Sequence, residues 1–235
     1  MDRTLVANIK AHGGAAAIAE WRKANPEPPE DAEYARSPHI DLSKADLQGV
    51  DFSGADLSGV EFLYANLDHA RFVSTNLEHA DLQYASAEGA DFTEANLTWT
   101  NLQFLKAKRA RFKRAVLDHA NVRQGSFVHA ICDGMKGAYL NAAYANFANA
   151  RFTNATIELA DFRSVRLIGA SFKQARLTDV RFGRAKFDRD TFTGAIAKNC
   201  STTKPTVARL VPGLEFFSAS GRVDPHPNPF TGKRR

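Results

Sequence analysis

Apolar and polar residues follow each other along most of this chain in blocks of five. From Ile40 to Asn199 the first and third positions of each block are mostly apolar or small, and the other three are mostly polar. These residues make 32 consecutive blocks without insertion or deletion, with Leu or Phe at the third position in 24 and Ala at the first in 20. A period of five fits neither an amphipathic helix nor a strand. The pattern therefore predicts a repeat architecture.

The individual blocks read Ala-(Asp/Asn)-Leu-X-X, as in ADLQG at 45–49, ADLSG at 55–59 and ADLQY at 80–84. In this pattern residues 40–199 resemble the pentapeptide-repeat family. The resemblance implies an all-β solenoid, namely a right-handed quadrilateral parallel β-helix with four blocks per coil. The 32 blocks would then form eight coils of four blocks each.

The residues offer an independent check on the coil length, because third positions four blocks apart should stack and resemble each other. Seven of the 13 third-position Phe residues share one such column, and Leu predominates in the next. Each of these side chains, once buried, contributes about 1.5–3 kcal/mol of transfer free energy. The predicted core columns are Phe52, Phe72, Phe92, Phe112, Phe152, Phe172 and Phe192, followed by Leu57, Leu77, Leu97 and Leu117.

One stretch, residues 130–142, departs from the core pattern. Its third positions are Cys132, Gly137 and Ala142. We expect an under-filled or distorted coil there, with Met135 and Leu140 partly compensating. Cys132 is interpreted as a small inward-facing hydrophobe, with a reactive or metal-binding thiol as the alternative.

Both flanks of the repeat are interpreted as caps, because bare ends of a β-rod expose unpaired backbone. Residues 1–39 are expected to form an N-terminal helical cap over 4–24, broken at Gly13-Gly14, followed by a Pro-rich connector. Residues 200–217 are expected to cap the other end, with a short helix over 205–210, as a plug or as a homodimer contact. Residues 218–235 are expected to be a disordered tail.

Composition and cysteine content indicate a cellular compartment. The chain is 44% hydrophobic and 24% charged, as globular proteins are. Its two cysteines exclude a disulfide scaffold and favour a reducing compartment. No apolar run is long enough to span a membrane, and the N-terminus lacks the apolar segment of a secretory signal. We therefore expect a cytoplasmic protein.

Motifs for catalysis are missing from the sequence. It contains no P-loop, nucleophile elbow, CxxC pair or HExxH motif. His79 and His119 share a column but lie two coils apart, about 10 Å, which is too far for one metal ion. We therefore expect no enzyme, cofactor or metal, and turn to binding surfaces.

Two outward-facing columns at fifth positions are rich in aromatic residues. Such clusters mark protein-binding sites, although the same rings would also stabilise the corners of a rod by packing on each other. Both interpretations stay open. The candidate partner-binding residues are Tyr64, Tyr84, Phe104 and Tyr144 in one column, and His79, Trp99, His119 and Tyr139 in its neighbour.

The formal net charge of +5 hides two unlike halves of the repeat, with −1 added by residues 1–39 and +4 by residues 200–235. Residues 40–99 carry 11 acidic and 2 basic side chains, and residues 100–199 carry 7 acidic and 18 basic ones. Either half is interpreted as a solvated surface or as a binding surface. The candidate acidic surface is Asp41, Asp46, Asp51, Asp56, Glu61 and Asp81. The candidate basic surface is Lys106, Lys108, Arg109, Arg111, Lys113 and Arg114.

Three functions are compatible with such a rod. The first is a non-catalytic scaffold that binds a protein partner through its aromatic and charged faces. The second follows from the resemblance, since quinolone-resistance members of the family resemble duplex DNA and protect DNA gyrase, a type II topoisomerase. Only the first three coils are acidic enough for such mimicry. The third and weakest is nucleic-acid binding through the basic half. A charge-polar rod also predicts salt-sensitive association between the acidic part of one molecule and the basic part of another.

Overall fold

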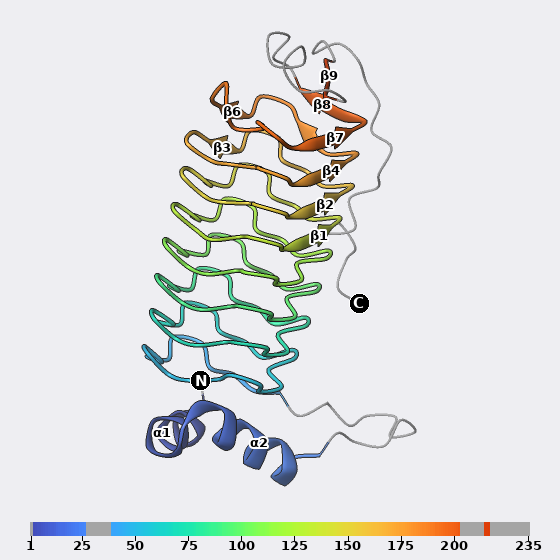
Figure 1. Ribbon diagram of the computed structural model, residues 1–235. Coiled ribbons are helices and arrows are strands. Elements are labelled where there is room, and N and C mark those ends of the chain that lie inside the picture. The colour runs from blue at the N-terminus through green and yellow to red at the C-terminus, as the bar shows by residue number, and fades with distance from the viewer. Residues whose placement is uncertain (1, 27–38, 203–213, 217–235) are drawn as a thin grey trace.

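The computed structural model describes residues 2–26, 39–202 and 214–216. Figure 1 shows stacked coils that form a rod, with two helices against one end. Parallel β-bridges join each block to the fourth block after it, as in Asp41 to Glu61 and Glu61 to Asp81. The predicted parallel β-solenoid is therefore confirmed, whereas its right-handed sense and the count of eight coils stay predictions.

A tight turn ends most blocks and explains the period of five. The carbonyl of a third-position residue accepts a hydrogen bond from the amide of the next first position, as Leu42 does from Ala45 at 3.1 Å. The fifth position, inside this turn, has a positive φ at every block from Lys44 to Asn199 except at Arg189. A positive φ at this point is the geometry of a type II turn. The turn places fifth-position side chains at the corners of the rod.

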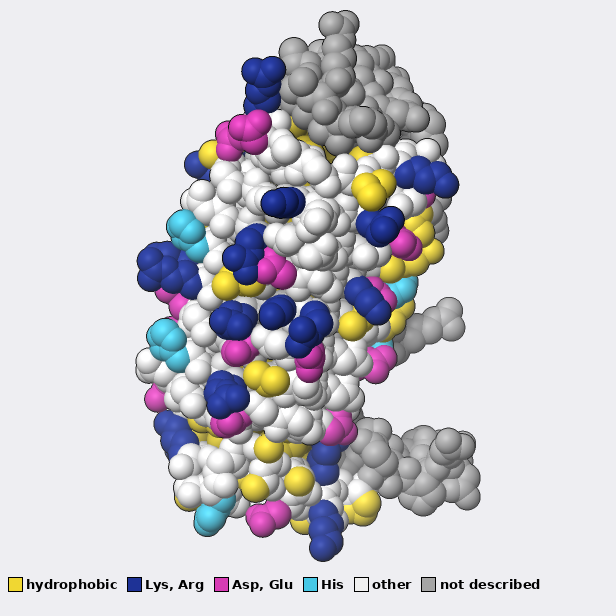
Figure 2. Space-filling view, viewed as in Figure 1, with side chains coloured by type: hydrophobic (Ala, Val, Ile, Leu, Met, Phe, Trp, Pro, Cys, Tyr) yellow, Lys and Arg dark blue, Asp and Glu magenta, His cyan; other side chains and the backbone are white. Residues whose placement is uncertain are grey.

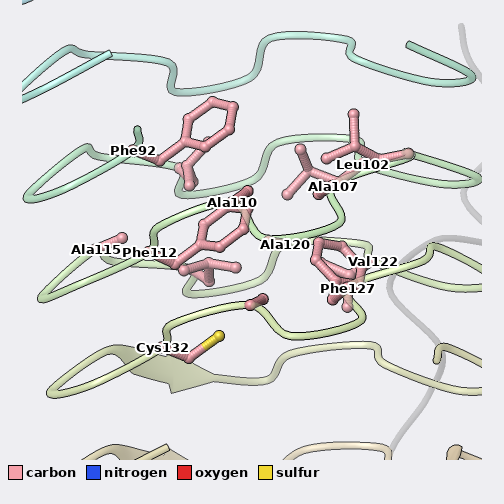
Figure 3. Close-up of a cluster of buried hydrophobic side chains, with 14 of the residues drawn as sticks. Phe92, Leu102, Ala107, Ala110, Phe112, Ala115, Ala120, Val122, Phe127 and Cys132 are labelled. Carbon is pink, nitrogen blue, oxygen red and sulfur yellow. The ribbon is translucent and has the colours of Figure 1, made fainter. Parts of the chain in front are cut away.

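First and third positions fill the interior. Phe72 and Phe92 stack with ring centroids 4.8 Å apart, and Phe92 and Phe112 follow at 4.9 Å. Figure 3 shows the rings of Phe92 and Phe112 pointing into the rod, with the small side chains of Ala110 and Ala115 beside them. Every residue of the predicted Phe and Leu columns is buried, so the predicted core is confirmed.

In the stretch 130–142, larger side chains at first positions compensate for the small third positions as expected, while its under-filling stays a prediction. Met135 and Leu140 are buried as expected, and both lie within 3.4 Å of the Cβ that Gly137 lacks. In addition, Phe127 enters from the neighbouring face and meets Phe112 edge to face at 5.8 Å (Figure 3). Phe127 therefore continues the aromatic packing from Phe112 onto the neighbouring face.

Beyond residue 135, short strands replace many of the isolated β-bridges and form three separate parallel sheets along the rod. Parallel pairing orders these strands β1-β2-β4-β7, β3-β6 and β5-β8-β9. All pairs are parallel, which continues the solenoid to its C-terminal end. The strands are β1 (Lys136–Ala138), β2 (Thr156–Glu158), β3 (Arg166–Leu167), β4 (Arg176–Thr178), β5 (Arg181–Phe182), β6 (Lys186–Phe187), β7 (Ile196–Lys198), β8 (Cys200–Thr202) and β9 (Leu214–Phe216).

The repeat is distorted near its end, although the sequence keeps its phase there. The first position of block 190–194 is Asp190, which is exposed, while Thr191 beside it is buried. A carboxylate at an inward position would lose its hydration without a partner. The chain therefore turns Asp190 outward, and the amide of Gln174 bonds to the carbonyl of Gly194 instead of that of Thr193.

The N-terminal helices α1 (Arg3–His12) and α2 (Gly14–Ala24) confirm the predicted helix and its break at Gly13. They satisfy carbonyls of the first coil that have no coil before them. The Asp2 amide donates to the Asp41 carbonyl at 2.8 Å, and the Arg22 guanidinium donates to the carbonyls of Asp56 and Ser58. Among the described residues, neither helix is long and apolar enough to cross a membrane.

The C-terminal end is partly described. Strand β9 pairs in parallel with β8, with Cys200 opposite Leu214. Fewer residues therefore separate these two paired positions than the four blocks that separate bridged positions elsewhere in the rod. The predicted helix over 205–210, the connector over 27–38 and the tail over 218–235 lie outside the described residues.

Candidate binding surface

A first aromatic ladder consists of Tyr64, Tyr84 and Phe104, which occupy successive fifth positions at one corner. Tyr64 and Tyr84 stack at 4.9 Å, and Tyr84 and Phe104 at 4.6 Å with planes 3° apart. Tyr84 is nonetheless 39% exposed. Gln124 follows in the same column, and then Tyr144, whose ring lies 5.1 Å from the guanidinium of Arg123. The structure therefore brings together three of the four aromatic residues predicted for this column.

A second aromatic ladder runs along the neighbouring corner and consists of His79, Trp99, His119 and Tyr139. Trp99 and His119 stack at 4.0 Å, and His119 and Tyr139 at 4.7 Å. The Nδ1 atom of His119 is buried, with no hydrogen-bond partner among the described residues. Because neighbouring rings cover each other's faces within a ladder, an approaching molecule meets ring edges and their polar tips.

Between the two ladders lies a row of amide side chains, the amide stripe, formed by Asn101, Asn121 and Asn141. Each Oδ1 accepts from the backbone amide two residues on, at 3.3 Å. Asn101 and Asn141 are partly exposed and Asn121 is buried, and within the described part of the chain no acceptor bonds to the Nδ2 groups of the three. Sequence reasoning missed this stripe, although Asn at second positions four blocks apart signals it.

Most carboxylates of the predicted acidic surface already have cationic or hydrogen-bonding partners. Lys10 lies 3.3 Å from Asp46 and Arg22 lies 3.6 Å from Asp56, so the helical cap covers part of the first coil's charge. The hydrogen bond and charge of Lys10 lower the pKa of Asp46. Asp51 faces Arg71 at 3.6 Å, and Glu61 faces His39 at 3.1 Å.

The six residues of the predicted basic surface divide between two faces. Arg111 lies 3.5 Å from Asp91, and the Arg114 Nε donates to Glu94 at 2.9 Å. The hydrogen bond and charge of Arg114 lower the pKa of Glu94. By contrast, Lys106, Lys108 and Arg109 are exposed and make no ion pair with any described residue. Figure 2 shows cations lying beside carboxylates over the middle of the visible face.

No group suited to covalent or metal chemistry emerges from the described residues. Cys132 is buried, and burial raises the pKa of its thiol, so the inert interpretation of this residue holds. No three His, Cys, Asp or Glu side chains in the described ranges converge in a way that would hold a metal ion. A groove of about 420 Å³ between the cap and the first coil is lined by Lys10, Gly13 and Asp46, among others.

Comparisons with known proteins agree with this architecture. The model of a family described as pentapeptide repeat region matches residues 45–122. A second model, described as pentapeptide repeats (8 copies), matches residues 138–167, 145–184 and 158–194. A search of curated proteins finds no match.

Solved structures are similar at low identity. A trypsin-treated variant of QnrB1, a plasmid-mediated fluoroquinolone resistance protein, is 20% identical over 77% of this chain and 84% of that one, with a TM-score of 0.39. HetL, involved in heterocyst differentiation regulation in the cyanobacterium Nostoc sp. strain PCC 7120, is 22% identical over 77% and 92%, with a TM-score of 0.30. Scores this low carry no argument about partner or activity.

Proposed function

Because the chain belongs to the pentapeptide-repeat family, we propose that it is a non-catalytic scaffold that binds a protein partner. The binding surface is the face between the two aromatic ladders. A regular rod is a frame on which many surfaces can be mounted, so the proposal rests on the side chains at this face and not on the fold.

One observation carries the proposal. Partly exposed aromatic rings line both edges of this face, and the Nδ2 groups of the amide stripe between them have no hydrogen-bond acceptor among the described residues. Tyr84, Trp99 and Tyr139 are 39–41% exposed. Tyr and Trp are the residue types that dominate binding energy at protein interfaces, because they combine a large apolar area with a polar tip. The Nδ2 groups of the amide stripe would hydrogen-bond carbonyl or carboxylate oxygens of the partner.

Two double variants test this surface, Tyr84→Ser with Phe104→Ser and Trp99→Ser with Tyr139→Ser. A partner is captured with the wild-type chain and identified, and its affinity for each variant is then measured alongside thermal melting. We expect at least a tenfold loss of affinity with a small change in melting temperature. The control, Asn154→Ser with Gln174→Ser, removes exposed residues at another corner and should bind normally. Lost stability with retained affinity would show that the ladders serve the rod alone.

A second candidate is protection of a type II topoisomerase by DNA mimicry, favoured by the net charge of −9 over residues 40–99. The ion pairs of Lys10, Arg22 and Arg111 with carboxylates of those residues reduce the acidity that a mimic requires. Gyrase supercoiling with and without a quinolone tests this function directly. A gel shift with duplex DNA at rising salt tests nucleic-acid binding through residues 100–199. No effect in either assay leaves the protein scaffold.

A further inference from the structure

Charges on the rod are paired on one face and unpaired on another. On the face that carries the Phe column, cations meet carboxylates of the preceding coil: Arg71 meets Asp51, Arg111 meets Asp91 and Arg114 meets Glu94. These ion pairs neutralise most of the charge on this face, which we call the self-neutralised face, although Lys113 on it makes no ion pair with a described residue.

The face next to the first aromatic ladder differs. Asp68 and Glu88 lie on it in the second and third coils, and Lys106, Lys108 and Arg109 lie on it in the fourth. Asp68 accepts hydrogen bonds from Ser86 and from the Glu88 amide, but no cation bonds to it. Among the described residues, none of these five side chains forms an ion pair. Two uncompensated carboxylates are thus followed along the rod by three uncompensated cations.

The first aromatic ladder runs along the edge of this face over the same three coils. Tyr64, Tyr84 and Phe104 therefore lie beside the point where the unpaired charge changes sign. An aromatic strip bordered on one side by charges of both signs resembles part of a protein interface, with an aromatic centre beside a charged rim.

We propose that this corner binds a second copy of the chain, antiparallel and side by side. A two-fold axis between the third and fourth coils lays one ladder along the other. The same axis sets Glu88 of each copy against the cations at 106–109 of the other, so the contact is made twice and the assembly closes as a dimer. A parallel pair would instead set like charges together. The contact covers the first aromatic ladder, which also borders the proposed partner surface, whereas the second aromatic ladder stays outside it. The charged residues at 88 and 106–109 belong to the dimer contact alone, so reversing them tests the dimer separately from partner binding.

The mass of the purified full chain in solution tests this dimer. Sedimentation velocity at about 50 mM salt should give twice the monomer mass, and at about 500 mM salt the monomer mass, because added salt screens the charges at the rim. A monomer at both salt concentrations overturns the proposal. A dimer that high salt does not weaken also overturns it.

Charge reversal then locates the contact. Both the variant Lys106→Glu, Lys108→Glu, Arg109→Glu and the variant Asp68→Lys, Glu88→Lys should be monomeric at low salt. Mixed in equal amounts they should form a one-to-one dimer, because both contacts between them are then complementary. Glu88→Lys alone, which loses no side-chain hydrogen bond, should weaken the dimer at least tenfold.

The matched control is Arg111→Glu with Arg114→Glu, which reverses cations of the same coil on the self-neutralised face and should leave the dimer intact. A dimer that persists in either reversed variant, for example through the C-terminal segment, overturns the proposal. Failure of the mixture to associate does so as well, provided that both variants melt like the wild type.

Discussion

Two columns of stacked rings run along this rod, one inside it and one outside. Phe72 and Phe92 stack at 4.8 Å with planes 2° apart, and Tyr84 and Phe104 stack at 4.6 Å with planes 3° apart. Their geometry is the same, but the inner rings are fully buried and Tyr84 is 39% exposed. The four-block register therefore brings rings of one column close enough to stack both inside and outside the rod, although Phe162 and Phe182 are tilted by 53°. Stacking alone is no sign of function, whereas exposure is.

The largest loss of stability is expected from a substitution in the inner column. Phe92→Ala should lower the free energy of unfolding by about 3–5 kcal/mol, because it opens a cavity between two rings that cannot collapse. Urea unfolding at equilibrium measures this loss. Phe92→Leu should cost less than half as much, because Leu, the predominant residue of the neighbouring core column, leaves a smaller cavity than Ala. A loss below about 1 kcal/mol for the alanine variant would mean that the interior repacks freely.

A smaller effect is expected where the inner aromatic packing changes face. The Cβ of Gly125→Ala would lie 2.5 Å from the Phe127 ring and 3.1 Å from the Val122 carbonyl. Overpacking of this kind costs about 1–3 kcal/mol. Adding Phe127→Leu should recover part of the loss, and urea unfolding of the two single variants and the double variant measures the coupling. Additive losses would contradict the contact.

The interior could be predicted from the sequence because inward positions repeat with one period and accept few residue types. Phe127 is a third-position Phe like the others, but nothing in the sequence says that its ring packs edge to face on Phe112, the last ring before Cys132 in its column. Asp190 keeps the phase of the repeat, yet hydration of its carboxylate overrides the pattern. The regular period indicated where each coil lies, and the exceptions depended on side-chain volume and solvation.

The candidate surface was predictable only in part, for a related reason. Column positions follow from the period, so Tyr84 and Trp99 could be assigned to their corners in advance. Ion pairs depend on which rotamer reaches which carboxylate, so six neighbouring cations gave no hint that Arg111 is paired and Lys108 is not. The free Nδ2 groups of the amide stripe depend on which backbone amide each Oδ1 accepts, and a sequence does not show this.

The outer column should respond much more weakly than the inner one. Tyr84→Ala should lower the free energy of unfolding by about 1 kcal/mol, since ring–ring contacts contribute about 0.5–1.5 kcal/mol and little apolar area is lost. The same urea experiment measures it, and Tyr84→Phe should be neutral because the ring remains. A loss as large as that of Phe92→Ala would remove the distinction between the two columns.

The smallest effect is expected from relief of backbone strain at the corner that carries the first aromatic ladder. Lys44 and Tyr84 share a corner column with φ near 60°, but only Tyr84 has stacked neighbours. A left-handed conformation costs a residue other than glycine about 1–2 kcal/mol, and substitution by glycine removes this cost. About half of the resulting stabilisation is lost again, because glycine has more conformational freedom in the unfolded chain. Lys44→Gly should therefore stabilise the protein by about 0.5 kcal/mol.

Tyr84→Gly gains the same relief but loses two ring contacts, so it should be neutral or slightly destabilising. Glycine already occupies this conformation at Gly49, Gly54 and Gly59 in the first coil, so the backbone accepts it. Differential scanning calorimetry of both variants measures the difference, which reports what stacking adds at a strained corner. If both variants gained equally, the outer ladder would add nothing to stability, and only the binding of another molecule would account for aromatic residues at positions that favour glycine.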